Sequence, residues 1–203
     1  MDIHYYERSV MTRVPIANKS QRVLDDLHRH AWHLFNGTKN ERGRPFVFRF
    51  DPINDDRFLV TLRSDKPFKD SVERVLSVHE GDSVTVDLAS LPLARRTNHQ
   101  NGKEVQRERV LADDEWPDYM QRLIAKAGLS ETETPKLTRL AKYRLKPEMW
   151  SRKPVANATV TATIQDINAF ASAWLDGVGR SRGYGMGMLR LHPDSPVADG
   201  VAA

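Results

Sequence analysis

Residues 177–187 read Gly-Val-Gly-Arg-Ser-Arg-Gly-Tyr-Gly-Met-Gly, and five of the protein's 11 glycines fall within this stretch. A helical pattern over 166–175 precedes it, and the strand-like run 188–191 follows it. Glycine has no Cβ, so a loop of this composition lets the backbone present its N–H groups and approach a ligand closely. Two arginines within the loop, Arg180 and Arg182, favour an anionic ligand.

The glycine spacing narrows the class of anion. The loop has no Lys-Ser or Lys-Thr pair as a P-loop has, and its glycines do not follow the dinucleotide-binding pattern that opens a helix. A polynucleotide backbone is therefore the expected ligand. The loop residues expected to contact this backbone are Gly179, Arg180, Arg182, Gly183 and Gly185.

Composition gives a weaker signal for nucleic acid. The chain has 203 residues, and 31 basic residues against 27 acidic ones give a net charge of +4. The basic residues are clustered in pairs, which on loops are commonly just solvated. Cysteine is absent, which excludes disulfides, cysteine zinc sites and thiol nucleophiles. Because no apolar run spans a bilayer and no signal-peptide core is present, we expect a cytoplasmic protein.

The first half of the chain predicts a split βαβ order. A helix over 19–35 has one apolar face and stops at Asn36-Gly37. The segment 69–79 is ambiguous between helix and strand. The expected strands are 3–15, 45–51, 57–63 and 83–88.

The second half repeats this order after Leu91-Pro92-Leu93. A turn at 98–103 connects two basic strands, and helices are expected over 113–127 and 167–175. Further strands are expected over 137–145 and 155–164, with the last one after the glycine loop. The sequence therefore predicts an α+β fold of two tandem ferredoxin-like (RRM-like, βαββαβ) domains. The predicted units are 1–90, 91–193 with the glycine-rich loop, and a flexible tail at 194–203.

His28 lies at the border of the apolar face of the first helix. Such a histidine serves either as a partly buried hydrogen-bonding residue or as a general base, since RNA cleavage without metal requires a group that deprotonates a ribose 2′-hydroxyl near neutral pH. His30 and His33 lie on the same helix, but no two of the three have the i, i+4 spacing of a zinc pair, so no metal site is expected.

A basic stripe is predicted on the strand that starts near Arg139. Strand alternation puts Lys142, Arg144 and Lys146 on one face. This pattern is typical either of a solvated edge strand or of a surface that contacts phosphates. Together with His28, Lys142 and Arg144 would supply the base and the cations that phosphate cleavage needs.

Two runs of sequence resemble a known family. The run Leu27–Phe35 (LHRHAWHLF), followed by Arg44–Phe50 (RPFVFRF), is similar to the N-terminal half of the CasE-type CRISPR RNA-processing endoribonucleases of the RAMP superfamily. The glycine loop and Met188-Leu189 resemble the family's glycine-rich loop and the strand after it. The resemblance covers nearly the whole chain.

The resemblance implies metal-independent cleavage of precursor crRNA at the 3′ base of a CRISPR repeat hairpin, without a cofactor. The expected products carry a 2′,3′-cyclic phosphate (or 3′-phosphate) and a 5′-hydroxyl. The expected partners are the crRNA and the subunits of a Cascade-like effector complex. His28 occupies the family's catalytic histidine position, and 139–146 maps onto its basic strand. The RNA contacts expected outside the loop are Arg95, Arg96, Arg139 and Lys146, with Lys142 and Arg144 near the scissile phosphate.

The sequence departs from the family pattern at Asp25, where many members have a tyrosine three residues before the histidine. At this spacing Asp25 would either orient the imidazole or repel the phosphate. Two alternatives to the nuclease are a non-catalytic RRM-like RNA-binding protein and a structural ferredoxin-like protein. A pure RNA-binding protein has no need of His28, and the arginines of the glycine loop argue against a purely structural role.

Overall fold

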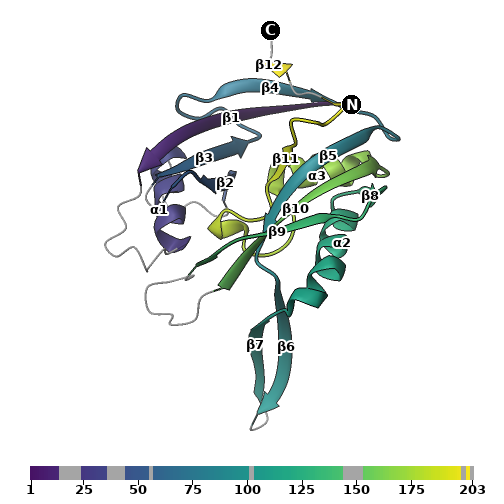
Figure 1. Cartoon of the computed structure of the whole chain (residues 1–203). Coiled ribbons are helices and arrows are strands. Elements are labelled where there is room, and N and C mark those ends of the chain that lie inside the picture. Colours follow the sequence, from purple (N-terminus) through teal and green to yellow (C-terminus); the bar gives the residue numbers. More distant parts are fainter. Residues whose placement is uncertain are drawn as a thin grey trace.

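The computed structural model spans residues 1–203 and describes all of them except 14–23, 36–43, 55–56, 101–102, 144–152, 198–199 and 202–203. For 95–100, 103–107, 139–143 and 200–201 it describes the backbone. The described part of the chain forms two antiparallel sheets, a protruding hairpin and a few helices (Figure 1). The predicted α+β class is therefore confirmed.

The first sheet has the strand order β12-β4-β1-β3-β2. The ambiguous segment 69–79 supplies strand β4, which pairs with one edge of β1 while β3 pairs with the other. The strands are β1 (Asp2–Arg13), β2 (Val47–Pro52), β3 (Arg57–Ser64), β4 (Val72–Ser77) and β12 (Gly200–Val201).

The second sheet has the order β11-β5-β10-β8, and β9 also pairs with β10. Strand β5 was expected in the first unit, yet it pairs with β10 and β11 of the second sheet. Because β4 already covers the edge of β1, β5 is free to become an inner strand, and seven of its eight residues are buried. The strands are β5 (Ser83–Ser90), β8 (Leu129–Glu131), β9 (Lys136–Tyr143), β10 (Lys153–Ile164) and β11 (Leu189–Leu191).

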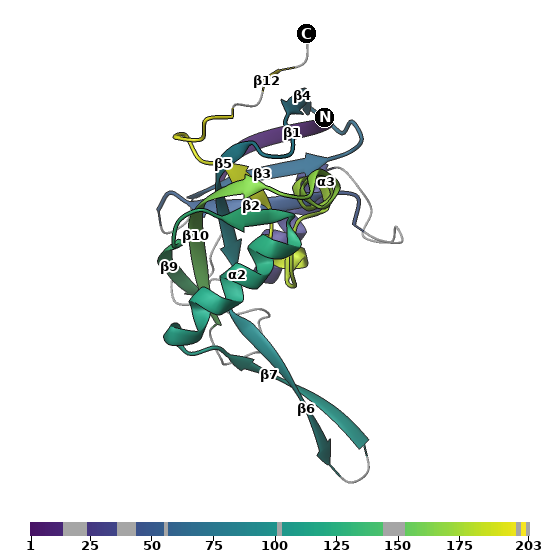
Figure 2. The ribbon, with the colours of Figure 1, turned by 90° about the vertical axis from the view of Figure 1, so that its right-hand side faces the viewer.

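Strands β6 (Leu93–Gln100) and β7 (Lys103–Val110) pair only with each other, in a two-stranded sheet. Figures 1 and 2 show this hairpin extending away from both larger sheets. It carries the basic strands expected on either side of the turn at 98–103. At its base, Arg109 donates to both carboxylate oxygens of Glu115, at 2.7 and 2.5 Å.

The helices are α1 (Leu24–Phe35), α2 (Trp116–Lys126) and α3 (Ile167–Asp176), with short 3₁₀ turns η1 (Asp113–Glu115) and η2 (Arg182–Tyr184). Helix α3 begins where Asp166 Oδ1 accepts hydrogen bonds from the backbone of Asn168 and Ala169, at 3.0 and 2.9 Å. This cap satisfies two N–H groups that the helix itself leaves unpaired. Gly177 then ends the helix with a φ of +73°. The glycine loop therefore starts at a fixed position.

Two hydrophobic cores lie against the sheets. Helices α2 and α3 pack on the second sheet, together with parts of β1 and β4. Helix α1 packs on β2 and β3 through Leu24, Leu27, Ala31 and Trp32, and this second core also contains Met186 of the glycine loop. The loop is therefore part of the same packed unit as α1.

Arg63 of β3 is a buried residue that connects the first sheet to α3 and β11. Its side chain is only 2% exposed, and its guanidinium donates to Glu7 Oε2 at 2.8 Å and to the carbonyl oxygens of Trp174 and Leu189 at 3.2 and 2.9 Å. The guanidinium also lies 3.7 Å from the ring centroid of Trp174. Acceptors and aromatic faces thus surround this buried cation, as a buried charge requires.

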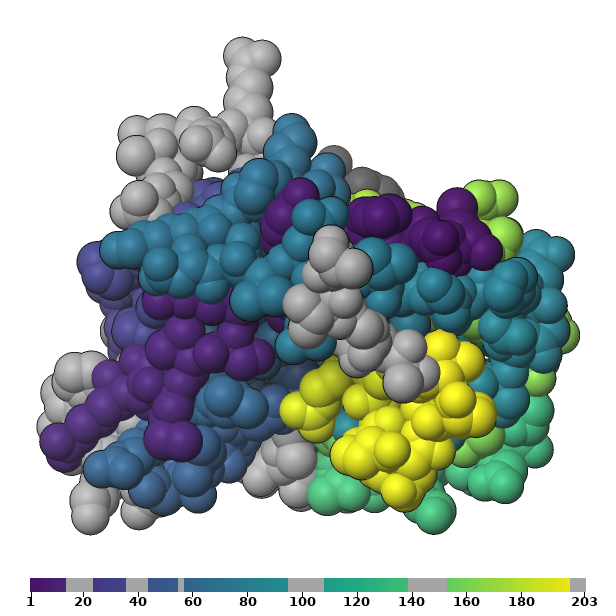
Figure 3. Space-filling view, turned by 90° about the horizontal axis from the view of Figure 1, so that it is seen from above, coloured from purple at the N-terminus to yellow at the C-terminus, as the bar shows by residue number. Residues whose placement is uncertain are grey.

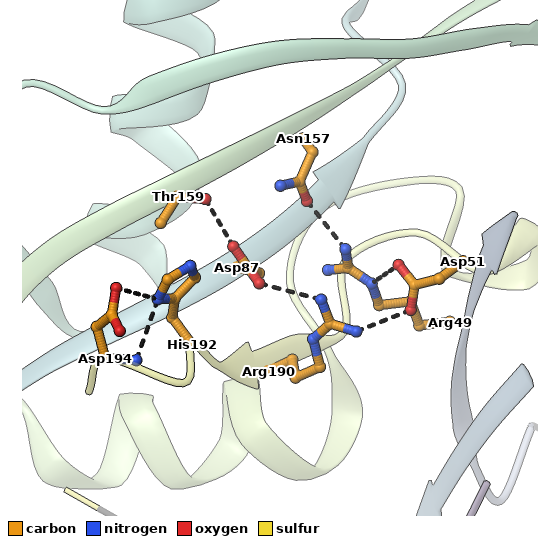
Figure 4. A network of polar contacts seen from close by, with 8 residues as sticks. All are labelled: Arg49, Asp51, Asp87, Asn157, Thr159, Arg190, His192 and Asp194. Atoms are coloured by element: carbon orange, nitrogen blue, oxygen red, sulfur yellow. Dashed lines mark hydrogen bonds and ion pairs between the residues drawn. The ribbon is translucent and has the colours of Figure 1, made fainter. Parts of the chain in front are cut away.

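A second polar network joins β2 to the second sheet (Figure 4). Arg190 of β11 donates to Asp51 and Asp87, at 2.9 and 3.1 Å. Arg49 of β2 donates to Asp51 at 2.9 Å and to Asn157 of β10 at 3.1 Å. Two arginines and two aspartates thus balance their charges across the joint between the sheets.

The C-terminal residues return to the first half of the chain. In Figure 3, the yellow C-terminal segment lies between the blue and purple atoms of the first sheet and the green atoms of the second half. Within the segment expected to be a flexible tail, Gly200 and Val201 form β12, paired with Val75 and Arg74 of β4. Among the described residues, no helix combines the length and the apolar character that crossing a membrane requires.

Candidate active site

The candidate site lies where α1, the start of β2 and the glycine loop meet. His28 projects from α1, half-buried. Its ring centroid lies 6.3 Å from that of Phe48 on β2 and 6.3 Å from that of Tyr184 in the glycine loop. The structure thus brings the predicted histidine and the predicted loop together, although about 150 residues separate them.

Trp32, one helical turn after His28, orients the imidazole. Its Nε1 donates a hydrogen bond to His28 Nε2 at 3.1 Å, and the two rings meet edge to face. An indole N–H can only donate, so His28 Nε2 is unprotonated in this arrangement and carries the lone pair. This is the state that a general base requires before it takes a proton.

The other two histidines of α1 lie in different surroundings. His33 is exposed, whereas His30 Nε2 lies 2.7 Å from Thr12 Oγ1 of β1. Burial lowers the pKa of His30, and the charge of His33 adds to this shift. His30 is therefore a neutral, hydrogen-bonded residue that packs against the first sheet.

Arg44, just before β2, lies beside the same rings. Its guanidinium carbon is 5.8 Å from the ring centroid of Phe46 and 5.9 Å from that of Phe48. Its Nη1 donates to the backbone carbonyl of Arg182 in the glycine loop. Burial, together with the charge of Arg182, lowers the pKa of Arg44 to about 10, so it stays protonated at neutral pH.

The glycine loop is shaped by its own packing. Gly185 has a φ of +78°, and a Cβ there would lie 2.7 Å from Phe50 and 2.8 Å from Phe48. Gly179 has a φ of +80°, and its Cβ would lie 2.8 Å from Leu123. Glycine is therefore needed at these positions for the loop to lie flat on β2 and α2.

A cavity of about 770 Å³ opens between these elements. His28 and Arg44 line it, as do the glycine loop and the turn after β3. The cations along its wall are Arg44, Lys66, Arg180 and Arg182, and the carboxylates are Asp65 and Asp176. Within the described part of the chain, none of these four cations forms an ion pair. The wall thus carries excess positive charge available to an anionic ligand.

Arg180 and Arg182 are both exposed. Arg182 Nη1 donates to the carbonyl of Asp176 at 2.9 Å, near the end of α3. Arg180 lines this cavity and two smaller hollows, one beside α2 and one beside α3. Of the loop residues expected to contact RNA, Gly179 and Gly183 also line the cavity, whereas Gly185 is buried against β2.

The other predicted residues lie outside this cluster or outside the described residues. Asp25 pairs with Arg29, with a 3.5 Å distance between Oδ2 and Nε, whereas His28 Nε2 accepts its hydrogen bond from Trp32. Arg139 and Lys142 lie on β9, opposite Ala156 and Pro154 of β10. Arg95 and Arg96 lie on β6 of the hairpin. Arg144 and Lys146 fall outside the described residues. Their roles stay predictions.

Sequence reasoning missed Arg44, Trp32 and Lys66 as members of the site. Arg44 belongs to the run that carries the family resemblance, but nothing in the sequence indicates that it meets residue 182. Trp32 follows His28 by four residues, a spacing that places both on one face of a helix. That signal was available, whereas no pattern marks Lys66.

Comparison with known proteins identifies the family of the chain. A family model described as "CRISPR associated protein" matches residues 7–193. A search of curated protein sequences gives no significant match.

Solved structures match nearly the whole chain. Cas6e from Escherichia coli K-12 has a TM-score of 0.66 at 18% identity, covering 94% of this chain and 99% of its own. Cse3 from Thermus thermophilus, bound to an RNA representing a pre-cleavage complex, has a TM-score of 0.65 at 14% identity, covering 94% and 100%. A chain of a CRISPR RNA-guided surveillance complex has a TM-score of 0.62 at 20% identity, covering 92% and 98%.

At these identities the structural likeness establishes the fold. It confirms the prediction of two ferredoxin-like domains, although the boundary at residue 90 stays a prediction. The family itself is shown by the sequence model, which spans nearly the whole chain and agrees with the predicted CasE-type resemblance. The chain therefore belongs to the CRISPR-associated protein family.

Proposed function

We propose that this protein is a metal-independent endoribonuclease that binds a CRISPR repeat hairpin and cleaves precursor crRNA. The observation that carries the proposal is the position of His28: its ring, with an unprotonated Nε2, lines a cavity whose four cations form no ion pair within the described part of the chain. A base and positive charge in one cavity suit the cleavage of a phosphodiester by its own ribose. The structural likeness to RNA-bound Cse3 supports RNA as the ligand.

The chemistry follows from the residues present. His28 takes the proton of the ribose 2′-hydroxyl, and the 2′-oxygen forms a bond to phosphorus. The bond from phosphorus to the 5′-oxygen then breaks, and that oxygen leaves with the electron pair and takes a proton from solvent. The products are a 2′,3′-cyclic phosphate and a 5′-hydroxyl. Before this step, the hydrogen bond from Trp32 to His28 Nε2 has to break so that the 2′-hydroxyl can donate to Nε2, because one lone pair accepts one strong hydrogen bond.

The RNA path extends beyond the cavity. We infer that the hairpin RNA runs along the basic strand and the protruding arm, where the sequence clusters cations. Phosphate contacts of this kind hold the RNA in position and carry no sequence information by themselves. The residues assigned to this path are Arg95, Arg96, Arg139, Lys142, Arg144 and Lys146. We also propose that the product crRNA stays bound, with the protein as a subunit of a Cascade-like complex, as the match to a surveillance-complex chain suggests.

The test is cleavage of CRISPR repeat hairpins, including the repeat encoded beside the gene, by wild type and by His28→Ala. We expect His28→Ala to lose activity by a factor of about 10²–10⁴ while hairpin affinity stays nearly unchanged. The exposed His33 provides the matched control, and His33→Ala should cleave like wild type. If wild type binds the hairpins without cutting them, the protein is a non-catalytic RNA-binding module.

The metal prediction is tested in the same assay. Cleavage should continue in EDTA, and the fragments should end in a cyclic phosphate and a 5′-hydroxyl. Among the described residues, no group of three or more histidines and carboxylates is arranged to hold a metal ion. A 3′-hydroxyl product, or strict dependence on magnesium, would contradict the mechanism and indicate a metal-activated water.

A further inference from the structure

Arg44 differs from the other arginines of the cavity wall in how firmly it is held. The rings of Phe46 and Phe48 flank its guanidinium, and the Arg182 carbonyl accepts from its Nη1. Its Nε is buried, and the side chain as a whole is half-buried, whereas Arg180 and Arg182 are exposed. Strand β2 and the glycine loop therefore fix the guanidinium from two sides.

The charge of Arg44 has no carboxylate beside it. No described carboxylate forms an ion pair with it, and the acceptor of its Nη1 is a neutral carbonyl. Burial lowers the pKa of Arg44, and the charge of Arg182, another cation, lowers it further. Taking a charge partly out of water costs free energy unless an opposite charge compensates it. Such a site favours an anion that enters from the cavity.

Arg44 and His28 both lie beside the ring of Phe48 and line the same cavity. The Phe48 centroid lies 6.3 Å from the His28 centroid and 5.9 Å from the Arg44 guanidinium carbon, and both residues line the same cavity. A phosphate whose adjacent 2′-hydroxyl reaches His28 would therefore lie within reach of Arg44. The planar guanidinium can present two N–H groups to two oxygens of one phosphate.

We propose that Arg44 is a catalytic residue that contacts the non-bridging oxygens of the scissile phosphate and stabilises the negative charge that builds on them. This inference rests on the proposed function, because it assigns a role in the same cleavage. A fixed donor stabilises a transition state better than a mobile one, since it does not have to reorganise as the charge develops. Exposed Arg180 and Arg182 are then left to hold the RNA on either side.

The test compares Arg44→Gln and Arg44→Lys with wild type in single-turnover cleavage at saturating enzyme. We expect Arg44→Gln to lower the rate constant about 10²-fold or more, in the range found for removing one transition-state donor. Arg44→Lys keeps the positive charge but lacks the planar guanidinium, so its rate constant should fall by a smaller factor. The matched control is Arg57→Gln on β3, an exposed arginine outside the cavity, which should cleave at the wild-type rate.

A sulfur substitution at the scissile phosphate separates contact from mere support of the fold. Replacing one non-bridging oxygen by sulfur should slow cleavage by wild type more than it slows cleavage by Arg44→Gln. The reason is that the variant has already lost the donor to that oxygen. An equal sulfur effect in both proteins, or full activity of Arg44→Gln, overturns the proposal. If Arg44→Gln does not fold, the same comparison made with Arg44→Lys decides it.

These outcomes are distinct from failure of the proposed function. If wild type cleaves and His28→Ala does not, the proposed function stands, and the Arg44 variants alone decide this inference. If wild type cleaves no repeat hairpin, the proposed function fails, and the catalytic role of Arg44 fails with it.

Discussion

Arginines at the joint between the sheets and arginines at the cavity wall have opposite surroundings. At the joint, Arg63 and Arg49 are 2% and 3% exposed, and each donates to a carboxylate. At the cavity wall, Arg44, Arg180 and Arg182 have no carboxylate partner among the described residues. The first set uses its charges to hold the fold, whereas the second keeps its charges available for a ligand. Partnership, rather than burial alone, separates the two roles.

The largest effect on stability is expected from Arg63→Met. The change leaves Glu7 Oε2 without its charged partner and two buried carbonyl oxygens without a donor. The free energy of unfolding should therefore fall by about 3–5 kcal/mol. Urea unfolding measures it. The matched change at the cavity wall, Arg180→Met, should cost less than about 0.5 kcal/mol. Equal losses for both variants would contradict the division between the two regions.

Gly185→Ala tests whether stability and cleavage change together when the packing of the glycine loop is disturbed. The new Cβ would overlap Phe48 and Phe50 at a positive φ, so we expect a loss of about 1–3 kcal/mol in unfolding free energy. Because His28 and Arg44 both flank Phe48, cleavage by the folded fraction should fall as well. The control is Gly81→Ala, which has a similar φ of +91° with no atom within 4 Å of the added Cβ. It should cost stability through backbone strain alone and leave cleavage unchanged.

Trp32→Phe tests the cavity side of the comparison, because phenylalanine keeps an aromatic ring but lacks the N–H that donates to His28 Nε2. This hydrogen bond stabilises the unprotonated imidazole, so without it protonation becomes easier. The acid limb of the single-turnover pH–rate profile should then move to higher pH by less than about one unit, since one hydrogen bond contributes about 1 kcal/mol. Trp116→Phe removes an indole N–H that donates to Leu111 at 3.2 Å, away from the cavity, and should leave the profile in place. A shift in both variants, or in neither, contradicts the role given to Trp32.

Salt dependence tests whether the exposed cations of the wall contact phosphates. The Arg180/Arg182 double alanine should reduce the slope of log affinity against log salt by roughly 0.7–0.9 for each lost contact. Hairpin affinity measured between low and moderate salt gives the slope. Arg57→Ala, at an exposed arginine elsewhere, should keep the wild-type slope. An unchanged slope in the double variant would show that the loop arginines are simply solvated.

The smallest expected effect concerns His30, which shares α1 with His28 but faces the first sheet. Its folded-state pKa is lowered from the ordinary value of 6.5, chiefly by burial, so the folded state resists its protonation. This contribution to stability is present above pH 6.5 and is lost as the pH falls through the lower folded-state pKa. Urea unfolding between pH 7.5 and pH 5 should show a shallower decline for His30→Gln than for wild type. His33→Gln removes only the smaller, charge contribution to the His30 shift, so its curve should lie between those of wild type and His30→Gln, closer to wild type.

Much of the fold could be predicted because its signals are local. Helix α3 has a capping aspartate, an apolar face and a terminal glycine, and the structure places it at Ile167–Asp176 against a prediction of 167–175. Strand β5 shows the limit. Its sequence predicts a strand, but whether it pairs with β1 or β10 depends on β4, which the sequence left ambiguous.

The site divides in the same way. His28 was predicted from its place on a helix and from the family resemblance, and both are properties of a short segment. Arg44 was missed because its role depends on the Arg182 carbonyl, 138 residues away. Pairwise distances of this kind do not follow from periodicity. For Lys142 and Arg144, the family resemblance is still what supports their role.

The hydrogen bond between Arg44 and the Arg182 carbonyl also has a consequence for when the site forms during synthesis of the chain. Synthesis delivers α1 and β2 early, but the wall of the cavity is complete only when the last part of the glycine loop has been translated and has packed onto β2. A nascent chain that still lacks residues 177–187 has its histidine without the surface that surrounds it. The proposed cleavage site is therefore complete only after the glycine loop has been translated and has packed in place.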